Sequence, residues 1–288
     1  MSHSFAAPFE TYVAPARAAP EIWRIIAGIC IIAATFGSFA FALFWCVDRF
    51  FADFGGLNPS VGTLFAFLAT FIGMAAGPMV AVRFLHARST GSLFGRAPWV
   101  LADFVWSVVI VAIIFVISIA TWSIWFDARP NLDLSTWLVF LPFTLIGLLI
   151  QTGAEELVFR GYLQQQLSAR FASPVAWAVL PSALFGLLHY DPINTGGNVW
   201  FIVAATGLFG LLAADITART GSIGAAWGFH FANNVFALLI LSVDGPLTGL
   251  ALYVTPYEAD APILRQLIFI DIATICVAWI LLRRILRR

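Results

Sequence analysis

Long apolar runs separated by short polar stretches dominate the sequence of 288 residues. A helix needs about 20 mostly apolar residues to cross a bilayer. Eight runs come close to this length: 25–47, 61–85, 104–126, 137–153, 175–190, 199–214, 223–243 and 264–282. The pattern predicts an all-α, polytopic membrane protein with about eight transmembrane helices, of which the short fifth and sixth could be broken or re-entrant.

The chain is expected to form one membrane domain preceded by a tail. Residues 1–20 are more polar than the rest of the chain and hold Pro8, Pro15 and Pro20, so they predict a flexible cytoplasmic tail. The first apolar run is too long for the core of a signal peptide and should remain as the first span. Residues 21–288 then make a single helical transmembrane domain.

The distribution of arginine predicts the orientation in the membrane, because cytoplasmic loops carry an excess of positive charge. Arginines precede the first run, lie between the second and third, follow the fourth and sixth, and end the chain, while the intervening loops lean acidic. Arg49, Arg129 and Arg265 are exceptions, one in each of three outer segments. We therefore expect a multi-pass protein of the bacterial inner membrane with both termini cytoplasmic.

The composition agrees with a membrane protein and argues against several other classes of protein. Hydrophobic residues make up 61% of the chain and charged residues 10%, and the mean hydropathy is +0.94, far from the balance of a soluble domain. The formal net charge is zero, which gives no support to nucleic-acid binding. Cys30, Cys46 and Cys276 all lie inside apolar runs, which argues against a disulfide framework or a zinc knuckle.

A few polar and ionisable residues on the apolar segments predict a functional centre. Such groups are costly at membrane depth and are tolerated mainly inside a bundle, where they are put to use. The set comprises Glu155, Glu156, Arg160, His189, His230 and Asn234. On a helix, residues four apart share a face, which pairs Glu156 with Arg160 and His230 with Asn234. The arginine can hold Glu156 ionised and fixed, leaving Glu155 for chemistry.

The spacing is compatible with one intramembrane active-site chamber. A turn is expected at 172–174, with Pro174 in the first turn of the next helix. At about 1.5 Å rise per residue, Glu155 and His189 then lie roughly 27 and 24 Å from Ser173 on antiparallel helices. By the same rise His230 lies about 12 Å into its span, counted from Ser222. The chamber would open to the cytoplasmic half of the membrane.

Two other features are interpreted as structural. Gly73 and Gly77 form a Gly-x-x-x-Gly pattern that lets two helices pack closely. Asp271 interrupts the last apolar run about two turns from its outer end. We interpret it as a snorkelling or paired structural carboxylate. No internal repeat is evident, so an inverted-repeat transporter gains no support.

The three polar motifs, in this order and on these segments, resemble the CPBP (Abi) family of CAAX-type prenyl endopeptidases and bacteriocin-processing or immunity proteins. The family pattern reads Glu-Glu-x-x-x-Arg, Phe-x-x-x-His and His-x-x-x-Asn or Asp. This chain has Glu155-Glu156-x-x-x-Arg160, Phe185-x-x-x-His189 and His230-x-x-x-Asn234, and the likeness covers about 137–243. The resemblance implies an all-helical intramembrane peptidase of the type II CAAX kind.

The resemblance also implies a role for each residue. Glu155 with His189 would activate the attacking water, His230 and Asn234 would stabilise the oxyanion, and Glu156 with Arg160 would shape the site. General chemistry leaves a second mechanism open. Glu155, His189 and His230 could instead hold a catalytic zinc ion with an open position for water. Because no His-Glu-x-x-His motif occurs, the sequence does not require a metal.

The predicted function is therefore a membrane-embedded peptidase, CAAX-protease-like, that cuts a CAAX-type or leader-peptide-type substrate. Its expected partners are a peptide or protein, including lipidated ones, and the lipid bilayer. Two alternatives remain: an inactive scaffold or immunity protein of the same fold, and a proton-coupled carrier, which would also bury Glu, His and Arg.

Overall fold

The computed structural model describes residues 5–51, 59–124, 127–245 and 247–286. Within this part of the chain, six helices are long and apolar enough to cross a membrane. They are Ile22–Arg49, Val61–Leu85, Ala97–Thr121, Leu134–Arg170, Pro192–Thr220 and Leu264–Ile285. The protein is therefore an all-α, multi-pass membrane protein, as the apolar runs predict.

The helical elements follow one another along the chain as α1 (Ala7–Val13), η1 (Ala14–Ala18), α2 (Ile22–Phe51), α3 (Pro59–Leu85), η2 (Thr90–Leu93), α4 (Ala97–Trp122), α5 (Leu134–Glu156), η3 (Leu157–Gln164), α6 (Gln165–Arg170), η4 (Val175–Val179), α7 (Leu180–Leu187), α8 (Pro192–Thr195), η5 (Gly196–Asn198), α9 (Val199–Thr220), α10 (Gly224–Val235), η6 (Phe236–Ile240), η7 (Thr248–Leu250) and α11 (Leu264–Ile285). The eight predicted runs are mainly helical, but two of them form helices shorter than a full span, and the seventh ends in the strand Leu241–Asp244. The sixth run, expected to be short, lies in the long segment Pro192–Thr220. The fifth run folds as η4 and α7, and the seventh as α10 and η6. Residues 125 and 126, at the end of the third run, lie outside the described residues.

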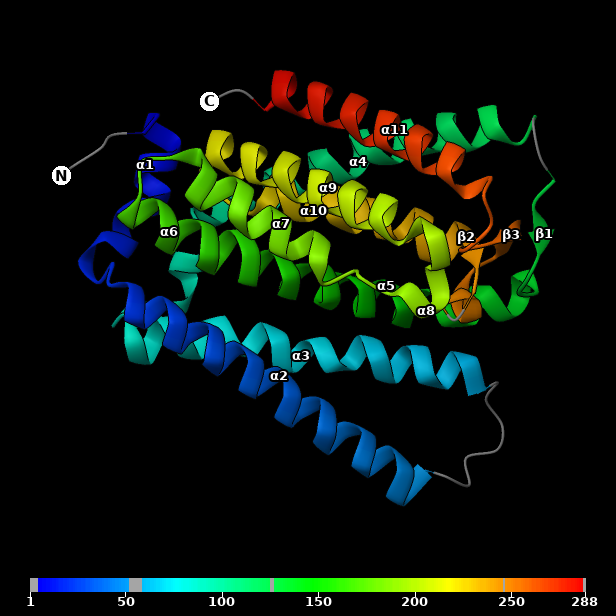
Figure 1. The fold of residues 1–288 in the computed structure, drawn as a ribbon, viewed down its shortest axis with the longest axis horizontal. Coiled ribbons are helices and arrows are strands. Elements are labelled where there is room, and N and C mark those ends of the chain that lie inside the picture. The colour runs from blue at the N-terminus through cyan, green and yellow to red at the C-terminus, as the bar shows by residue number, and fades with distance from the viewer. Residues whose placement is uncertain (1–4, 52–58, 125–126, 246, 287–288) are drawn as a thin grey trace.

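The two chain ends lie at one end of the bundle, and a small sheet lies at the other (Figure 1). The sheet has the order β1-β3-β2, with β1 (Arg129–Pro130) antiparallel to β3 (Tyr253–Glu258) and β2 (Leu241–Asp244) parallel to it. The apolar pattern did not predict these strands. They tie the α4–α5 connection to the segment between α10 and α11.

The expected flexible tail is wrong for residues 5–18, which form α1 and η1. Phe9, Tyr12 and Val13 are at most 3% exposed. The Phe9 ring lies 5.1 Å from that of Trp177, between centroids. Alternation of apolar and polar residues at helical spacing gives this short segment one buried face, and the prolines stand at helix starts, where they are tolerated.

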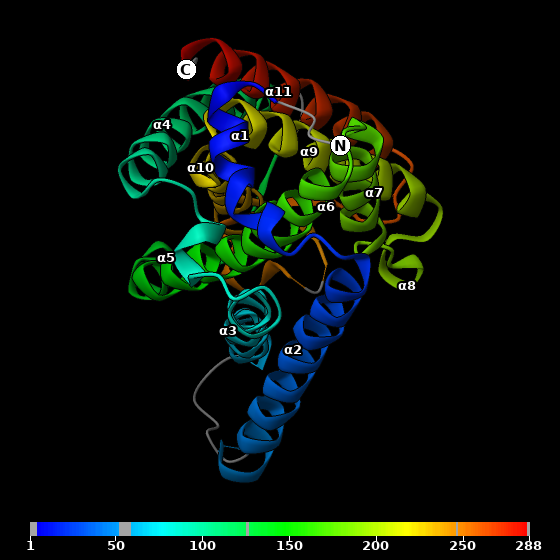
Figure 2. The same ribbon diagram turned by 90° about the vertical axis from the view of Figure 1, so that its left-hand side faces the viewer.

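Helices α2 and α3 cross at close range near the terminus end and separate towards the other end (Figures 1 and 2). A Cβ added to Gly77 would lie 2.7 Å from the Cα of Ile32, so the crossing requires glycine there. This agrees with the packing interpretation of the Gly-x-x-x-Gly pattern. Phe41 and Trp45, on the diverging half of α2, are exposed, as expected of a lipid-facing surface.

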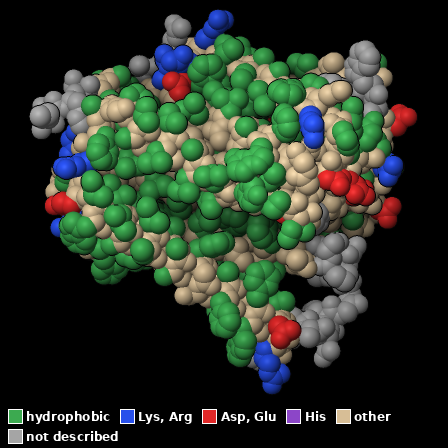
Figure 3. Space-filling view, viewed as in Figure 1, with side chains coloured by type: hydrophobic (Ala, Val, Ile, Leu, Met, Phe, Trp, Pro, Cys, Tyr) green, Lys and Arg blue, Asp and Glu red, His purple; other side chains and the backbone are tan. Residues whose placement is uncertain are grey.

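The outer surface suits a bilayer. Hydrophobic side chains cover most of the middle of the face in Figure 3, and charged side chains gather mainly towards the two ends of the bundle. Apolar side chains facing lipid and charges near the ends are the arrangement that a membrane imposes.

Candidate active site

The two glutamates lie at the point where an α-helix changes into a π-helix. Helix α5 ends at Glu156, and the π-helical segment η3 covers Leu157–Gln164 before α6 continues the same long helix to Arg170. Wide turns of this kind inside an α-helix are frequent at functional sites. All eight residues of η3 are buried, so the segment is part of the core.

Glu156 is the centre of a buried charged cluster. Arg160 Nη1 donates to Glu156 Oε1 at 2.9 Å, and the two side chains are 2% and 0% exposed. His230 Nδ1 donates to the same oxygen at 2.8 Å. Arg160 Nη2 also donates to the Gly210 carbonyl on α9 at 3.0 Å. The cluster thus joins three helices and confirms that Glu156 and Arg160 pair within one helix face.

Glu155 faces a different set of partners. Gln151 Nε2 donates to Glu155 Oε1 at 2.7 Å, and His230 Nε2 lies 3.5 Å from Glu155 Oε2. Asn234 in turn donates its amide N–H to Gln151 Oε1 at 2.9 Å. Glu155 is therefore held by the linked side-chain amides of Gln151 and Asn234 and not by an arginine. Glu155 retains 12% side-chain exposure, whereas Glu156 has none.

Gln151 is a site residue that the sequence analysis did not include. Its position gives a signal that could have found it. It stands four residues before Glu155 on a helix that is otherwise nearly all apolar, so it must share the face of Glu155. An amide at membrane depth needs a partner for the same reason that a carboxylate does.

His189 comes to the same place from the short helix α7. Its Nδ1 donates to the Phe185 carbonyl at 2.9 Å, which leaves Nε2 as the proton acceptor of the neutral ring. The Phe185 ring packs against both histidines, at 5.0 Å from His189 and 5.9 Å from His230 between centroids. The Phe-x-x-x-His motif therefore supplies an imidazole together with the aromatic wall beside it.

Close packing fixes α10, which carries His230 and Asn234. A Cβ on Gly228 would collide with the carbonyl oxygen of Phe104 on α4, so only glycine permits the approach. On its other side Trp227 Nε1 donates to the Leu149 carbonyl of α5 at 3.2 Å. Helix α10 is thereby held between α4 and α5 with its polar face towards the glutamates.

A pocket with about 470 Å³ of empty space collects the site. Its lining includes four of the six predicted residues, Glu155, His189, His230 and Asn234, together with Gln151, Phe185, Asn233 and Asp271. Glu156 and Arg160 lie behind this wall and contact the pocket through His230. The predicted turn also agrees with the structure, since the chain reverses between Arg170 and Val175. The sequence spacing thus brings all three motifs together.

Two details differ from the sequence expectation. The imidazole nearest to Glu155 is that of His230, at 3.5 Å, and no direct hydrogen bond between Glu155 and His189 is present in the described structure. Asp271, which was interpreted as a snorkelling or paired carboxylate, is exposed and lines the pocket. Its carboxylate makes no hydrogen bond or ion pair within the part of the chain that the structure describes.

The geometry of these residues decides whether they could hold a metal ion. Both histidines have the Nδ1 partner that a metal-binding imidazole usually has, a carbonyl for His189 and a carboxylate for His230. However, no three His, Cys, Asp or Glu side chains among the described residues converge closely enough to hold an ion. The predicted ligand set Glu155, His189 and His230 does not fit a metal in this arrangement.

Comparison with known proteins supports the predicted resemblance. A multi-pass helical fold with a buried Glu-Arg-His cluster defines an intramembrane site, and residues 135–236 match a family model described as "Type II CAAX prenyl endopeptidase Rce1-like". The match includes all three motifs. It confirms the resemblance to the CAAX-type prenyl endopeptidases over this core.

A relative from Bacillus subtilis (strain 168), described as "Uncharacterized protein YyaK", is 32% identical over 142 residues. The matched region is 47% of this chain and 47% of the relative, so the chain spans about half the length of the curated relative it matches. Helices α2, α3, α4 and α11 lie outside the family match at 135–236.

Proposed function

We propose that the protein is an intramembrane endopeptidase that hydrolyses a peptide bond with a water activated by Glu155. Its substrate is a membrane-associated peptide or protein of the CAAX or leader-peptide type, lipidated substrates included. The observation that supports the proposal most strongly is that two adjacent carboxylates have different partners. Glu156 is neutralised by Arg160, whereas Glu155 faces a pocket and has only amide and imidazole partners.

Glu155 is the general base. Its Oε1 is fixed by Gln151, and its Oε2, 3.5 Å from His230 Nε2, has no hydrogen-bond donor among the described residues and can take a proton. His189, whose Nδ1 proton is engaged by Phe185, presents a neutral Nε2 that can accept a hydrogen bond from the same water. Glu155 takes one proton from the water, the hydroxide adds to the carbonyl carbon, and Glu155 then delivers the proton to the leaving amine.

His230 and Asn234 stabilise the negative charge on the carbonyl oxygen. His230 donates Nδ1–H to Glu156, and its Nε2, 3.5 Å from Glu155 Oε2, is the ring nitrogen that would donate to the carbonyl oxygen when it carries a proton. Asn234 uses one amide hydrogen on Gln151 and has a second available. Two such donors act as an oxyanion hole.

Glu156 and Arg160 are positioning residues. They do not face the pocket, and their effect passes through His230, whose ring is oriented by Glu156. Since the residues do not fit a metal as they stand, no step of this mechanism uses one. The proposed location is the bacterial inner membrane with both chain ends cytoplasmic, supported by the arginine distribution.

The experiment is substrate trapping followed by a cleavage assay. Glu155→Gln protein, expressed in its host membrane and crosslinked to bound proteins, should enrich a substrate that mass spectrometry identifies. The wild type in nanodiscs should cleave that substrate, and Glu155→Gln should lower turnover by roughly 10²–10⁴-fold. Glu258→Gln is the matched control, because this exposed carboxylate on β3 lies outside the pocket.

The two alternative functions give different results. Near-normal turnover in Glu155→Gln would show that the base is assigned wrongly. Solute flux in proteoliposomes that is unchanged by Glu155→Gln and His189→Ala would favour a carrier. A cellular phenotype that survives both substitutions would favour a scaffold.

A further inference from the structure

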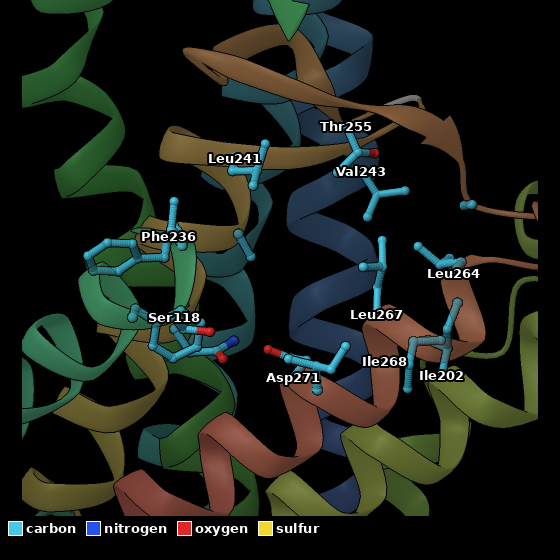
Figure 4. A pocket seen from close by; sticks show the side chains of 16 residues that line it. Ser118, Ile202, Phe236, Leu241, Val243, Thr255, Leu264, Leu267, Ile268 and Asp271 are labelled. Atoms are coloured by element: carbon cyan, nitrogen blue, oxygen red, sulfur yellow. The ribbon is translucent and has the colours of Figure 1, made fainter. Parts of the chain in front are cut away.

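A large apolar groove lies beside the candidate site. It is formed by α4, α9, the α10–η6 segment, strands β2 and β3, and the first two turns of α11, and it encloses about 1110 Å³ including its open mouth. Figure 4 shows side chains from these elements converging on one space, with the strands on one side and α11 across from η6. Its apolar walls include Phe115, Phe236, Leu241, Leu264, Leu267 and Ile268.

The groove and the active-site pocket share part of their walls. Asn233 and Asp271 line both, so the groove lies directly beside the pocket that Glu155 and His230 border. From this junction the groove runs towards the sheet end of the bundle, because Val243 and Thr255 of β2 and β3 form its far wall.

The opposite side of the site is filled by protein. The Tyr12 hydroxyl of α1 donates to the Leu93 carbonyl at 2.7 Å and lies 3.3 Å from the Arg160 carbonyl oxygen. Tyr12 and Arg160 are 3% and 2% exposed. Helix α1 therefore covers the site at the terminus end, while the exposed His189 lines another part of the pocket wall.

Asp271 stands where groove and pocket meet. It is about 11 Å along α11, counting from Leu264. In Figure 4 its carboxylate points across the groove towards the wall that carries Ser118 and Phe236. No residue in the described part of the chain bonds to it, and arginine or lysine is absent from the groove walls. Asp271 is exposed on the wall of the open groove, and an unpaired carboxylate beside apolar walls is stabilised by a cation or a strong hydrogen-bond donor.

We propose that this groove binds the substrate peptide, with apolar side chains along its walls and a lysine or arginine side chain paired with Asp271. The inference rests on the proposed peptidase function and adds a specificity residue to it. Asp271 belongs to α11, outside the segment 135–236 that matches the family. The preference would thus be a property of this chain and not of the shared core.

The test uses two fluorescent decapeptides of leucine, alanine and phenylalanine, which are identical except that one has a central lysine in place of leucine. Binding to the purified full chain in nanodiscs is measured by fluorescence anisotropy, and cleavage is followed separately by mass spectrometry. We expect the lysine peptide to bind at least about tenfold more tightly than the leucine peptide, the size of one charge-assisted hydrogen bond. Asp271→Asn should abolish the difference, and the control Glu258→Gln should keep it.

A second pair of variants tests the groove itself. Leu267→Trp fills the groove and should weaken binding of both peptides about tenfold, whereas Ile280→Trp, at an exposed position of the same helix outside the groove, should not. Equal affinity for the two peptides, a lysine preference that survives Asp271→Asn, or unchanged binding in Leu267→Trp would overturn the inference. Asp271-dependent binding without cleavage of either peptide would uphold the groove, while cleavage of the trapped substrate decides the peptidase proposal separately.

Discussion

Arg160 and His230 donate to one and the same carboxylate oxygen, Oε1 of Glu156, at 2.9 and 2.8 Å. The guanidinium comes from the helix of Glu156 itself, and the imidazole comes from α10, 74 residues further along the chain. One buried anion therefore fixes the geometry of two chain segments. Its removal should affect folding before it affects chemistry.

Glu156→Gln should destabilise the protein strongly. The substitution leaves the Arg160 cation buried without its counter-charge, and breaking such a pair costs about 3–5 kcal/mol. Arg160→Lys should be milder, since lysine keeps the charge but cannot reach both Glu156 and the Gly210 carbonyl as the planar guanidinium does. Thermal unfolding in a fixed detergent measures both. Glu155→Gln serves as the control, and a similar loss of Tm in Glu155→Gln and Glu156→Gln would contradict the division between the two carboxylates.

Gln151→Met should lower kcat by about tenfold while KM and Tm stay near the wild-type values. Methionine fills the same space but cannot donate to Glu155 or accept from Asn234, and misplacing a catalytic base is costly in rate even when the fold is intact. The measurement is steady-state cleavage of the trapped substrate. An increase in KM at constant kcat would mean that Gln151 binds substrate instead of positioning the base.

His86 should make the folded protein sensitive to mild acid. Burial, helped by the nearby Arg88 and Arg24, lowers the pKa of His86 against the opposing hydrogen bond to the Ala19 carbonyl. The unfolded chain, with an ordinary histidine pKa of about 6.5, then binds more protons than the folded chain as the pH falls. The stability contribution is therefore present above about pH 6.5 and is lost below it.

Melting temperatures from pH 8 to pH 5 measure this effect. The decline with acid should be smaller in His86→Gln, which can still donate to Ala19 and accept from Tyr162. Because the chain contains other histidines, the difference between the two proteins is the quantity to compare. Parallel curves would show that His86 does not contribute.

Reporter fusions should place Ala97 and Thr220 on the cytoplasmic side and Arg129 on the opposite side. Ala97 and Thr220 lie beside the bridge between Gly95 and Ser222 at the terminus end, whereas Arg129 lies in the sheet. Because Ala97 and Thr220 lie at the same end of the bundle, fusions at both should report the same side of the membrane. The arginine distribution predicts that this side is cytoplasmic. A cytoplasmic signal at Arg129 would reverse the proposed orientation.

Activity should survive metal removal. The described side chains do not converge on a common ion, so a chelator should leave turnover unchanged, and purified active protein should contain much less than one zinc per chain. Elemental analysis with a chelator titration measures both. One zinc per active chain, lost together with activity and restored by adding zinc back, would replace the glutamate mechanism with a metal mechanism.

Apolar runs and residue spacing predicted the membrane class and the meeting of three motifs, whereas six of the eight expected spans are long and apolar enough to cross a membrane in the described part of the chain. These features depend on local periodicity and on the cost of burying charge, and both can be judged from the sequence alone. The partner of each carboxylate was harder to predict. Glu156 with Arg160 follows from helix geometry alone, but the approach of His230 to both glutamates depends on how closely α10 packs against α4 at Gly228.

The N-terminal segment and the sheet were missed for a different reason. Prolines at 8, 15 and 20 indicate a tail when read one at a time, yet Tyr12 and Phe9 become buried only against helices far away in the sequence. Likewise, β1 consists of two residues whose partner strand is more than 120 residues away. A strand of two residues is too short to show the alternation by which strands are predicted.

The π-helical segment Leu157–Gln164 also changes the phase of the helix that contains it. Each π turn takes in one residue more than an α turn, so residues before Glu156 and after Gln164 do not fall on one stripe of a helical wheel. The first half directs Gln151 and Glu155 to the pocket, and the second directs Gln165 to the carbonyl oxygens of Tyr12 and Ser92. One continuous helix thus positions side chains for the pocket and for the N-terminal segment. Deleting a single residue from Leu157–Gln164 would rotate the second half of the helix relative to the first and misdirect Gln165.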